Sequence, residues 1–383
     1  MVGKWIPRER VEDVLAQTGR ASRRQRDLPG HVVVYYVIAL ALFMQVSYRE
    51  VLRCLLEGLG WLAGPHDRLK VTGNSGISQA RRRVGVEPLE RLHDEVVKPI
   101  AERRTRGAWY RQWRLITLDG SSLEVADEAV NREAFGLPGA SRGDSAYPQL
   151  RFVSLWENGT HILFASRQGS YATGEITLAR QVLKALQPGM LCLADRNYLS
   201  YQWWQQAQQT GAELLWRAQT HLRLEVLERY ADGSYRSAIY ASERDWRQRR
   251  DPLFLRVIEY QLEGVAEVEE FYRLVTTLSP GPGPAAELAA AYHERGEIEG
   301  ALDELKTHLR GARIVLRSKT PELVKQEFYG LLLAHFAVRG LMHEAALQAD
   351  EDPDRLSYVH AVRVIRRKLP RAVAIPPSAQ KGF

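Results

Sequence analysis

Three carboxylates in the sequence stand where they could share a metal ion. Asp119 ends a short apolar segment, Asp195 directly follows another, and Glu299 lies in a long helical segment. Two divalent ions about 3.5 to 4 Å apart need shared, hard oxygen ligands, and such a pair activates a water or a 3′-hydroxyl for in-line phosphoryl transfer. An acid at a strand end is most often a turn former, so the carboxylates alone leave a purely structural alternative open.

Glu299 is part of a regular pattern of side chains. Tyr292, Arg295, Glu299 and Lys306 occur at i, i+3, i+7 and i+14, which places them near one face of a helix. Glu299 can then face metal ions while the other three side chains reach phosphate groups. The alternative is an amphipathic, salt-bridged surface helix, because the same segment is rich in other acids.

The elements around Asp119 and Asp195 form a recognisable order. The pattern predicts strands over 114–119, 150–156 and 161–167, a helix over about 174–186 and a strand over 190–194. An Asn-Gly pair between the second and third strands is a strong hairpin signal. This order predicts an α/β fold with a ribonuclease H-like catalytic core, in which adjacent central strands bring the two aspartates together.

The rest of the chain divides into further segments. A helix near 200–210 precedes a β-rich insertion, expected over 213–283 inside the core and ending at a Pro/Gly run. Its expected strands are 213–217, 222–229, 235–240, 253–259 and 271–278. Helices are expected over about 285–309, 321–348 and 353–369. We therefore expect a helical N-terminal domain over 1–112, the first part of the core over 113–212, the insertion, and the second part of the core over 284–383.

The N-terminal region has the pattern of a helical, DNA-binding module. The apolar run 32–44 is 13 residues long, too short to cross a bilayer, and reads as a buried helix. The segment 74–85 resembles a helix-turn-helix recognition helix, with Arg81, Arg82 and Arg83 as expected DNA contacts. A surface helix with three arginines is the alternative. A second basic group is formed by Arg20, Arg23, Arg24 and Arg26.

Composition narrows the function classes. The 383 residues carry a net charge of +7, and residues 1–114 account for +9 of it. This distribution favours a phosphate-binding arm joined to a near-neutral body, although a solvated basic surface is the simpler alternative. Disordered, collagen-like and disulfide-rich classes are excluded. The two cysteines and the absence of a spanning segment predict a cytoplasmic protein. No nucleophile elbow or phosphate-binding P-loop is present.

Together the motifs resemble the DDE transposases of the insertion-sequence-four type. The signature Tyr-x2-Arg-x3-Glu-x6-Lys is matched from Tyr292 to Lys306, and the segments 118–121 (LDGS) and 195–198 (DRNY) resemble the two catalytic aspartate segments. The stretch 23–85 is similar to the helical domain that precedes the core in this group. The resemblance covers almost the whole chain, and Gly296 departs from it, because relatives often carry a bulky residue there.

The resemblance implies a mechanism. Asp119, Asp195 and Glu299 would be both catalytic residues and ligands of two Mg²⁺ ions, with Mn²⁺ as a substitute. Tyr292, Arg295 and Lys306 would bind DNA. The reaction would be cut-and-paste movement of an insertion sequence, with cleavage at terminal inverted repeats, a hairpin intermediate and strand transfer.

Partners and alternatives follow from the same resemblance. The chain would act on double-stranded DNA, both inverted repeats and target, as a homodimer in a prokaryotic cytoplasm next to the nucleoid. Relatives stabilise a flipped base with an aromatic residue of the insertion, for which Trp216 is the candidate, although a Trp in an apolar strand is more often core. The alternatives are a ribonuclease H-like nuclease that nicks without joining and a non-catalytic repressor that binds inverted repeats.

Overall fold

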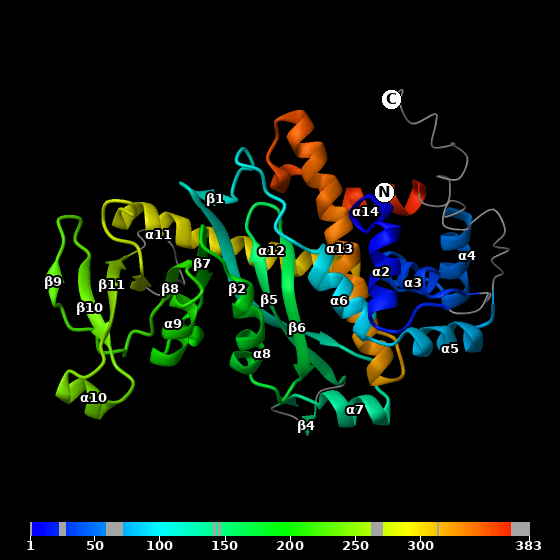
Figure 1. Cartoon of the computed structure of the whole chain (residues 1–383), viewed down its shortest axis with the longest axis horizontal. Helices are drawn as coiled ribbons and strands as arrows, with labels where there is room; N and C mark the ends of the chain where they lie inside the picture. The colour runs from blue at the N-terminus through cyan, green and yellow to red at the C-terminus, as the bar shows by residue number, and fades with distance from the viewer. Residues whose placement is uncertain are drawn as a thin grey trace.

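Helices form the beginning of the chain. The computed structural model describes residues 2–22, 28–58, 72–140, 143–144, 147–261, 271–311 and 314–368. In the described part before the first strand lie α1 (Val2–Trp5), α2 (Arg8–Gln17), α3 (Gly30–Leu42), α4 (Tyr48–Gly58), α5 (Asn74–Val84) and α6 (Glu87–Val96), drawn in blue to cyan in Figure 1. The predicted basic residues Arg23, Arg24 and Arg26 lie outside the described residues.

The N-terminal helices pack directly on the C-terminal part of the chain. Helix α3 is buried along nearly its whole length because its residues are apolar on every side. It lies against α13 (Pro321–Ala349), where a Cβ on Gly330 would come within 2.7 Å of Val37. The lack of a side chain at Gly330 therefore permits the close contact between these two helices. The core is continuous from the N-terminal helices into the sheet region.

The described strands form one mixed ten-stranded sheet and a separate pair. The sheet order is β6-β5-β2-β7-β8-β12-β11-β10-β9, with β1 paired to β2. Strands β7 and β8 run parallel to β2, whereas β5 runs antiparallel to both β2 and β6. The bounds are β1 (Trp109–Tyr110), β2 (Trp113–Glu124), β3 (Gly139–Ala140), β4 (Gly143–Asp144), β5 (Gln149–Glu157), β6 (Ile162–Ser170), β7 (Met190–Ala194), β8 (Glu213–Arg217), β9 (Glu228–Arg229), β10 (Tyr235–Ile239), β11 (Leu253–Tyr260) and β12 (Tyr272–Thr276).

The insertion continues the central sheet. Strands β12, β11, β10 and β9 extend it beyond β8, toward the left of Figure 1. The predicted Asn-Gly hairpin and the strands flanking it are confirmed by the pairing of β5 with β6. The strand expected over 222–229 is wrong for its first six residues, since only Glu228–Arg229 pair with β10. The sequence pattern did not predict that the strands of the core and those of the insertion are hydrogen-bonded into one sheet.

Helices cover the sheet and close the chain. Beside the sheet are α7 (Ala129–Phe135), α8 (Glu175–Val182) with η1 (Leu183–Ala185), η2 (Arg196–Tyr198), α9 (Tyr201–Gln208) and α10 (Glu243–Gln248). The chain then continues through α11 to α13 and ends its described part with η5 (Pro353–Arg355) and α14 (Tyr358–Lys368). In the described residues, no helix combines the length and the apolar character that crossing a membrane requires.

The helical segment expected over 285–309 is present with the predicted ends. It consists of α11 (Ala285–His293), the 3-10 turn η3 (Glu294–Gly296), α12 (Glu297–Asp303) and the π-helical turn η4 (Glu304–Leu309). It crosses the sheet region from the insertion toward α13 (Figure 1). Changes of helical type within one helix are frequently found at functional sites. We call residues 285–309 the long helix.

Candidate active site

The structure places Asp119 and Asp195 on neighbouring strands. Strands β2 and β7 pair in parallel with Leu118 opposite Ala194, and the two aspartates are the next residue of each strand path. Leu193 belongs to the smaller of the two apolar clusters. Because side chains alternate along a strand, Asp195 continues on the same sheet face as Leu193. The expected approach of the two aspartates is confirmed, and we call this pair the acidic edge.

The charge of the acidic edge is only partly balanced. Asp119 accepts a hydrogen bond from the Gly120 N–H at 2.8 Å. Burial raises the pKa of Asp119, and the nearby carboxylates of Glu175 and Asp195 raise it further, against the opposing effect of Arg295. The side chain of Asp195 does not cap the 3-10 turn that follows it. The carboxylates therefore repel each other at a place where an added cation would be stabilising.

The long helix brings two of the expected side chains onto this edge. The buried Tyr292 donates its hydroxyl to the Ala194 carbonyl at 3.3 Å, one residue before Asp195. Arg295 donates from Nη2 to Asp119 Oδ2 at 3.1 Å. The Nε of Arg295 is buried and has no hydrogen-bond partner among the described residues. Arg295 thus neutralises part of the acidic edge while its buried Nε remains without an acceptor among the described residues.

Glu299 and Lys306 lie farther along the same helix. Glu299 is exposed, and within the described residues its side chain forms no hydrogen bond or ion pair. Lys306 is half-buried, and burial lowers its pKa, with Arg310 acting in the same direction and Glu124 against it. The structure therefore unites Asp119, Asp195, Tyr292 and Arg295, while Glu299 is one turn beyond Arg295 without a partner.

Sequence reasoning missed a further carboxylate beside Asp119. Glu175 is the first residue of α8, and its carboxyl carbon lies 3.2 Å from where a Cβ on Gly120 would be. The carboxylate raises the pKa of both Asp119 and Tyr198. The available signal was an acid at the start of the helix that follows the third strand. Glu175 adds a third hard oxygen donor near the acidic edge.

Two expected DNA contacts are corrected by their burial. Arg81 is 2% exposed, because its guanidinium donates to Gln326, Ser318 and the Leu323 carbonyl. Trp216 is fully buried in β8 and packs edge-on against Trp204. A phosphate cannot reach the first and a base cannot stack on the second. Arg82 and Arg83, in contrast, are exposed on α5.

An aromatic group lies next to the acidic edge on the insertion side. Arg217, which follows Trp216 in β8 as Asp195 follows Ala194 in β7, stands over the Tyr272 ring at 4.3 Å. Tyr272 stacks on Tyr260 with ring centroids 5.3 Å apart. The Tyr260 hydroxyl is 3.1 Å from His293 Nε2 on the long helix. We call Arg217, Tyr260, Tyr272 and His293 the aromatic shelf.

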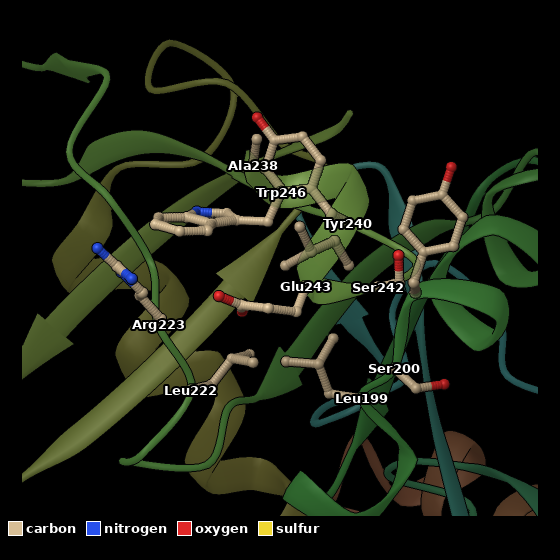
Figure 2. A pocket seen from close by; sticks show the side chains of 11 residues that line it. Leu199, Ser200, Leu222, Arg223, Ala238, Tyr240, Ser242, Glu243 and Trp246 are labelled. Carbon is tan, nitrogen blue, oxygen red and sulfur yellow. The ribbon is translucent and has the colours of Figure 1, made fainter. Parts of the chain in front are cut away.

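A pocket of about 190 Å³ opens between α9 and the tip of the insertion (Figure 2). It is mostly apolar, with Leu199 and Leu222 on one side. Arg223 lies over the Trp246 ring at 3.8 Å. Glu243 also contributes to the lining. No acidic-edge residue lines this pocket, so it is separate from the acidic edge.

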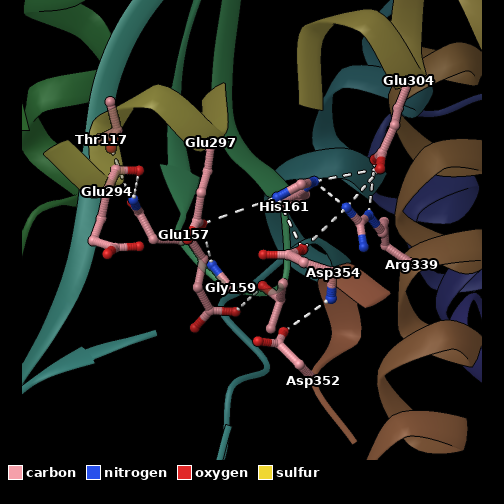
Figure 3. Close-up of polar contacts among 12 residues, drawn as sticks. Thr117, Glu157, Gly159, His161, Glu294, Glu297, Glu304, Arg339, Asp352 and Asp354 are labelled. Atoms are coloured by element: carbon pink, nitrogen blue, oxygen red, sulfur yellow. Dashed lines mark hydrogen bonds and ion pairs between the residues drawn. The ribbon is translucent and has the colours of Figure 1, made fainter. Parts of the chain in front are cut away.

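A second group of potential metal ligands joins the long helix to the turn before β6 and to η5 (Figure 3). His161, Glu297 and Asp354 form the one group in the described residues with three possible ligand atoms all within 4.8 Å of one another. Arg339 contacts the Nδ1 atom of His161 and lies 3.6 Å from Asp354. Because this guanidinium already supplies the positive charge, the group is a poor site for a catalytic cation.

The acidic edge fits a hard divalent cation better. Its carboxylate oxygens are the ligands that Mg²⁺ prefers. Only one cation, Arg295, is paired with them in the described residues. Glu299 is close along the helix and is not committed to another partner. The donor set and its uncompensated charge both suit such an ion.

Comparison with known proteins adds independent findings. Residues 112–337 match the family described as "Transposase DDE domain", and residues 1–94 match "Insertion element 4 transposase N-terminal". The chain is 26% identical over 372 residues to the Transposase InsG for insertion sequence element IS4 of Escherichia coli (strain K12), covering 96% of this chain and 82% of that protein. A piggyBac transposase synaptic complex with hairpin DNA, solved by cryo-EM, aligns with a TM-score of 0.49 at 10% identity, covering 98% of this chain and 81% of that one.

Proposed function

This chain belongs to the transposase DDE domain family and is a DNA transposase, and we propose that the acidic edge is its catalytic centre. The observation that carries the proposal is the parallel pairing of β2 with β7, which sets Asp119 beside Asp195. The family match spans both aspartates and the long helix. The N-terminal match covers α5, whose exposed Arg82 and Arg83 would bind the DNA backbone.

The sheet order supports a ribonuclease H-like core. In the order β6-β5-β2-β7-β8, only β5 runs against its neighbours, and the strands of the core follow one another in the chain as 3-2-1-4-5. Asp195 directly follows the end of β7, and Asp119 lies within β2, one residue beyond the last parallel pair Leu118–Ala194. This arrangement lets carboxylates from distant segments act on one phosphate.

The residues of the acidic edge would hold two Mg²⁺ ions. When bound, these ions activate the attacking oxygen and stabilise the leaving oxygen of phosphoryl transfer. Asp119, Asp195 and Glu299 would supply the carboxylates, with Glu175 close to Asp119. Arg295 would turn its guanidinium from Asp119 to a DNA phosphate, where its free Nε is an additional donor. Lys306, on the same helix, would contact the same strand.

The aromatic shelf would take the role first assigned to Trp216. Its rings are half-exposed or exposed, so a base flipped out of the helix could stack on them. A Tyr272→Ala variant should lose the quenching of 2-aminopurine placed at the cleavage junction. Trp246→Ala, which removes a ring from the separate pocket of Figure 2, should keep it. Equal quenching in both variants would contradict the assignment.

Cut-and-paste movement through a hairpin is the reaction these parts support best. A homodimer would bring two element ends together at the bacterial chromosome. The alternatives remain a nuclease that nicks without joining and a repressor that only binds. Strand joining separates the first alternative from a transposase, and metal-dependent cleavage separates the second.

The test uses purified protein and a supercoiled plasmid carrying the DNA that flanks the gene. Cleavage at the repeat ends should require Mg²⁺, be abolished by chelator and be absent in Asp195→Ala. Asp251→Asn removes an acid that is 81% exposed on the insertion and should cleave like the unaltered protein. Hairpin products would establish the cut-and-paste route. Ends that are bound but never cut would contradict a catalytic acidic edge.

A further inference from the structure

The long helix presents different chemistry on its two sides. At about 100° per residue, Glu297 and Glu304 lie roughly 160° and 140° around the helix from Glu299. The burial agrees with this geometry, because Glu299 is exposed whereas Glu304 is 9% exposed. Tyr292 and Arg295 reach the acidic edge from the side that carries Glu299. Glu297 and Glu304 on the opposite side therefore meet a different set of partners from Tyr292 and Arg295.

Glu304 is held by two side chains of α13. Arg339 donates to both of its carboxylate oxygens, from Nε at 2.8 Å and from Nη2 at 2.6 Å. His335, one turn earlier on α13, lies 3.3 Å from the same carboxylate. Arg339 and His335 are almost completely buried. The paired donors of a guanidinium fix direction as well as distance, so this contact restricts rotation of the helix.

His161 joins this contact to Glu297 and to the C-terminal part of the chain (Figure 3). Its Nδ1 contacts Arg339, and its Nε2 lies 3.1 Å from Asp354 and 3.9 Å from Glu297. The residue has a left-handed backbone with φ of 58°, which a non-glycine residue rarely adopts. We call His161, Glu297, Glu304, His335, Arg339 and Asp354 the ion cluster.

The hairpin turn between β5 and β6 adds backbone contacts to the same side. Gly159 donates its N–H to Glu297 at 2.9 Å, and the Asn158 side chain donates to the Glu294 carbonyl at 3.0 Å. A Cβ on Gly159 would lie 2.4 Å from the Arg106 carbonyl, so only glycine allows this approach. Two separate segments, the hairpin turn and α13, thus hold the long helix from behind, and Asp354 of η5 contacts His161 and Arg339.

Packing alone does not require this arrangement. Apolar side chains of similar volume often stabilise a buried site as well as ions do, whereas ions add directional contacts. The two ion-cluster residues on the long helix, Glu297 and Glu304, lie two residues before and five residues after Glu299. A small rotation of the helix would carry Glu299 away from the acidic edge without unfolding the protein.

We propose that Arg339 and His161 are positioning residues that fix the rotation of the long helix and so bring Glu299 to the metal-binding edge. Neither residue touches the acidic edge: Arg339 acts through Glu304, and His161 acts through Glu297 and Glu304. This inference rests on the proposed function, because it gives Glu299 the part of a metal ligand.

The test measures Mn²⁺ binding to the full chain in complex with a cleaved-end DNA duplex, by electron paramagnetic resonance. Arg339→Met should raise the dissociation constant for Mn²⁺ by about tenfold, as loss of supporting contacts around a metal site typically does, with DNA affinity unchanged. Arg339→Lys, which keeps the charge but not the paired donors, should recover part of the loss. If Arg339→Met does not fold, His161→Asn provides the same test with a smaller change.

The matched control is Arg81→Met. Arg81 is as buried as Arg339 and also pairs with α13, through Gln326 and Glu327, but it does not contact the long helix. It should lower the melting temperature without changing Mn²⁺ affinity. The same result for Arg339→Met and His161→Asn would overturn the inference and leave the ion cluster a structural support.

A second readout locates the bound metal directly. With Fe²⁺ in place of Mg²⁺ and added peroxide, the backbone should be cut near residues 119, 195 and 299 in the unaltered protein. In Arg339→Met the cut near 299 should be lost while the other two persist. Glu299→Gln tests the underlying assumption. Unchanged cutting and DNA cleavage in that variant would contradict the role of Glu299 itself, whatever Arg339 does.

Discussion

Two groups of carboxylates flank one helix and differ in how their charge is balanced. In the ion cluster, Glu304 lies against His161, His335 and Arg339, and these partners hold its pKa well below the usual range despite burial. At the acidic edge, Arg295 is the one cation paired with Asp119 in the described part of the chain, and burial raises the pKa of Asp119. The tighter cluster of ligand atoms is the ion cluster. Close spacing of potential ligands is therefore not sufficient to propose a metal site, because the charges already present around them also matter.

The largest effect should come from the acidic edge and fall on activity. Asp119→Asn removes one hard ligand, so we expect end cleavage to fall at least about a thousandfold. Stability should change little, because burial and the neighbouring carboxylates already disfavour the ionised form of Asp119. Plasmid cleavage and urea unfolding measure the two quantities. A variant that is destabilised but still cleaves would reverse the assignment of the two groups.

The ion cluster should show the opposite pattern when Glu304 is changed. Glu304→Ala leaves the buried Arg339 charge without its paired acceptor, and we expect about 3 to 5 kcal/mol loss in unfolding free energy. Urea unfolding in chelator measures this loss without any contribution from metal binding. Glu299→Ala is the control on the same helix and should change stability little, since it has no partner in the described residues. Equal losses in both variants would remove the contrast between the two sides of the helix.

Stability should depend on pH through Glu297. Burial, with the nearby Glu294 and Asp354 carboxylates, raises the pKa of Glu297 from 4.5 to about 9. The folded state then binds the proton more tightly than the unfolded state, so stability is complete below about pH 4.5 and is lost as the pH rises toward 9. Glu297→Gln mimics the protonated form and should add about 1 to 2 kcal/mol at pH 8. Urea unfolding midpoints, measured in chelator between pH 5 and 9, give the slope of stability against pH. This slope should flatten in Glu297→Gln. An unchanged slope would show that Glu297 is not its source.

The smallest effect concerns the cation that already occupies the acidic edge. Arg295→Met removes a competitor for Asp119, so Mn²⁺ should bind the DNA-free protein a few times more tightly. DNA binding should weaken at the same time, because a phosphate donor is lost. Titration calorimetry follows the metal and fluorescence anisotropy follows the DNA. Weaker Mn²⁺ binding without DNA would mean that Arg295 organises the edge rather than competing for it.

The sequence predicted the acidic edge because local signals were sufficient there. Apolar runs that end in an acid fix both strand and direction, and parallel neighbours place Asp119 beside Asp195. The Asn158-Gly159 turn and both ends of the long helix followed from local turn and breaker residues in the same way. The strand ends, the turn and the helix ends need only nearby residues, whereas the pairing of β2 with β7 followed from the predicted order of strands and helix.

Features that depend on distant segments could not be predicted. Arg81 and Arg82 are neighbours with the same side chain, and only the packing of α13 decides that the first is buried. The strand around Trp216 would be apolar whether the ring were buried or exposed, and the burial of the ring depends on its packing against Trp204. The ion cluster combines residues from four segments, and no spacing in the sequence marks it.

The continuous sheet has a consequence for distance along a nucleic-acid strand. Neighbouring strands are about 4.8 Å apart, so the three steps from β7 through β8 and β12 to β11 amount to about 14 Å. That is about the length of two nucleotides in an extended strand. Because hydrogen bonds fix each step, the sheet sets a constant distance between the proposed catalytic edge and the aromatic shelf. A change in loop length at the far end of the insertion leaves this distance unaltered, whereas a slip in the pairing of β8 with β12 would change it.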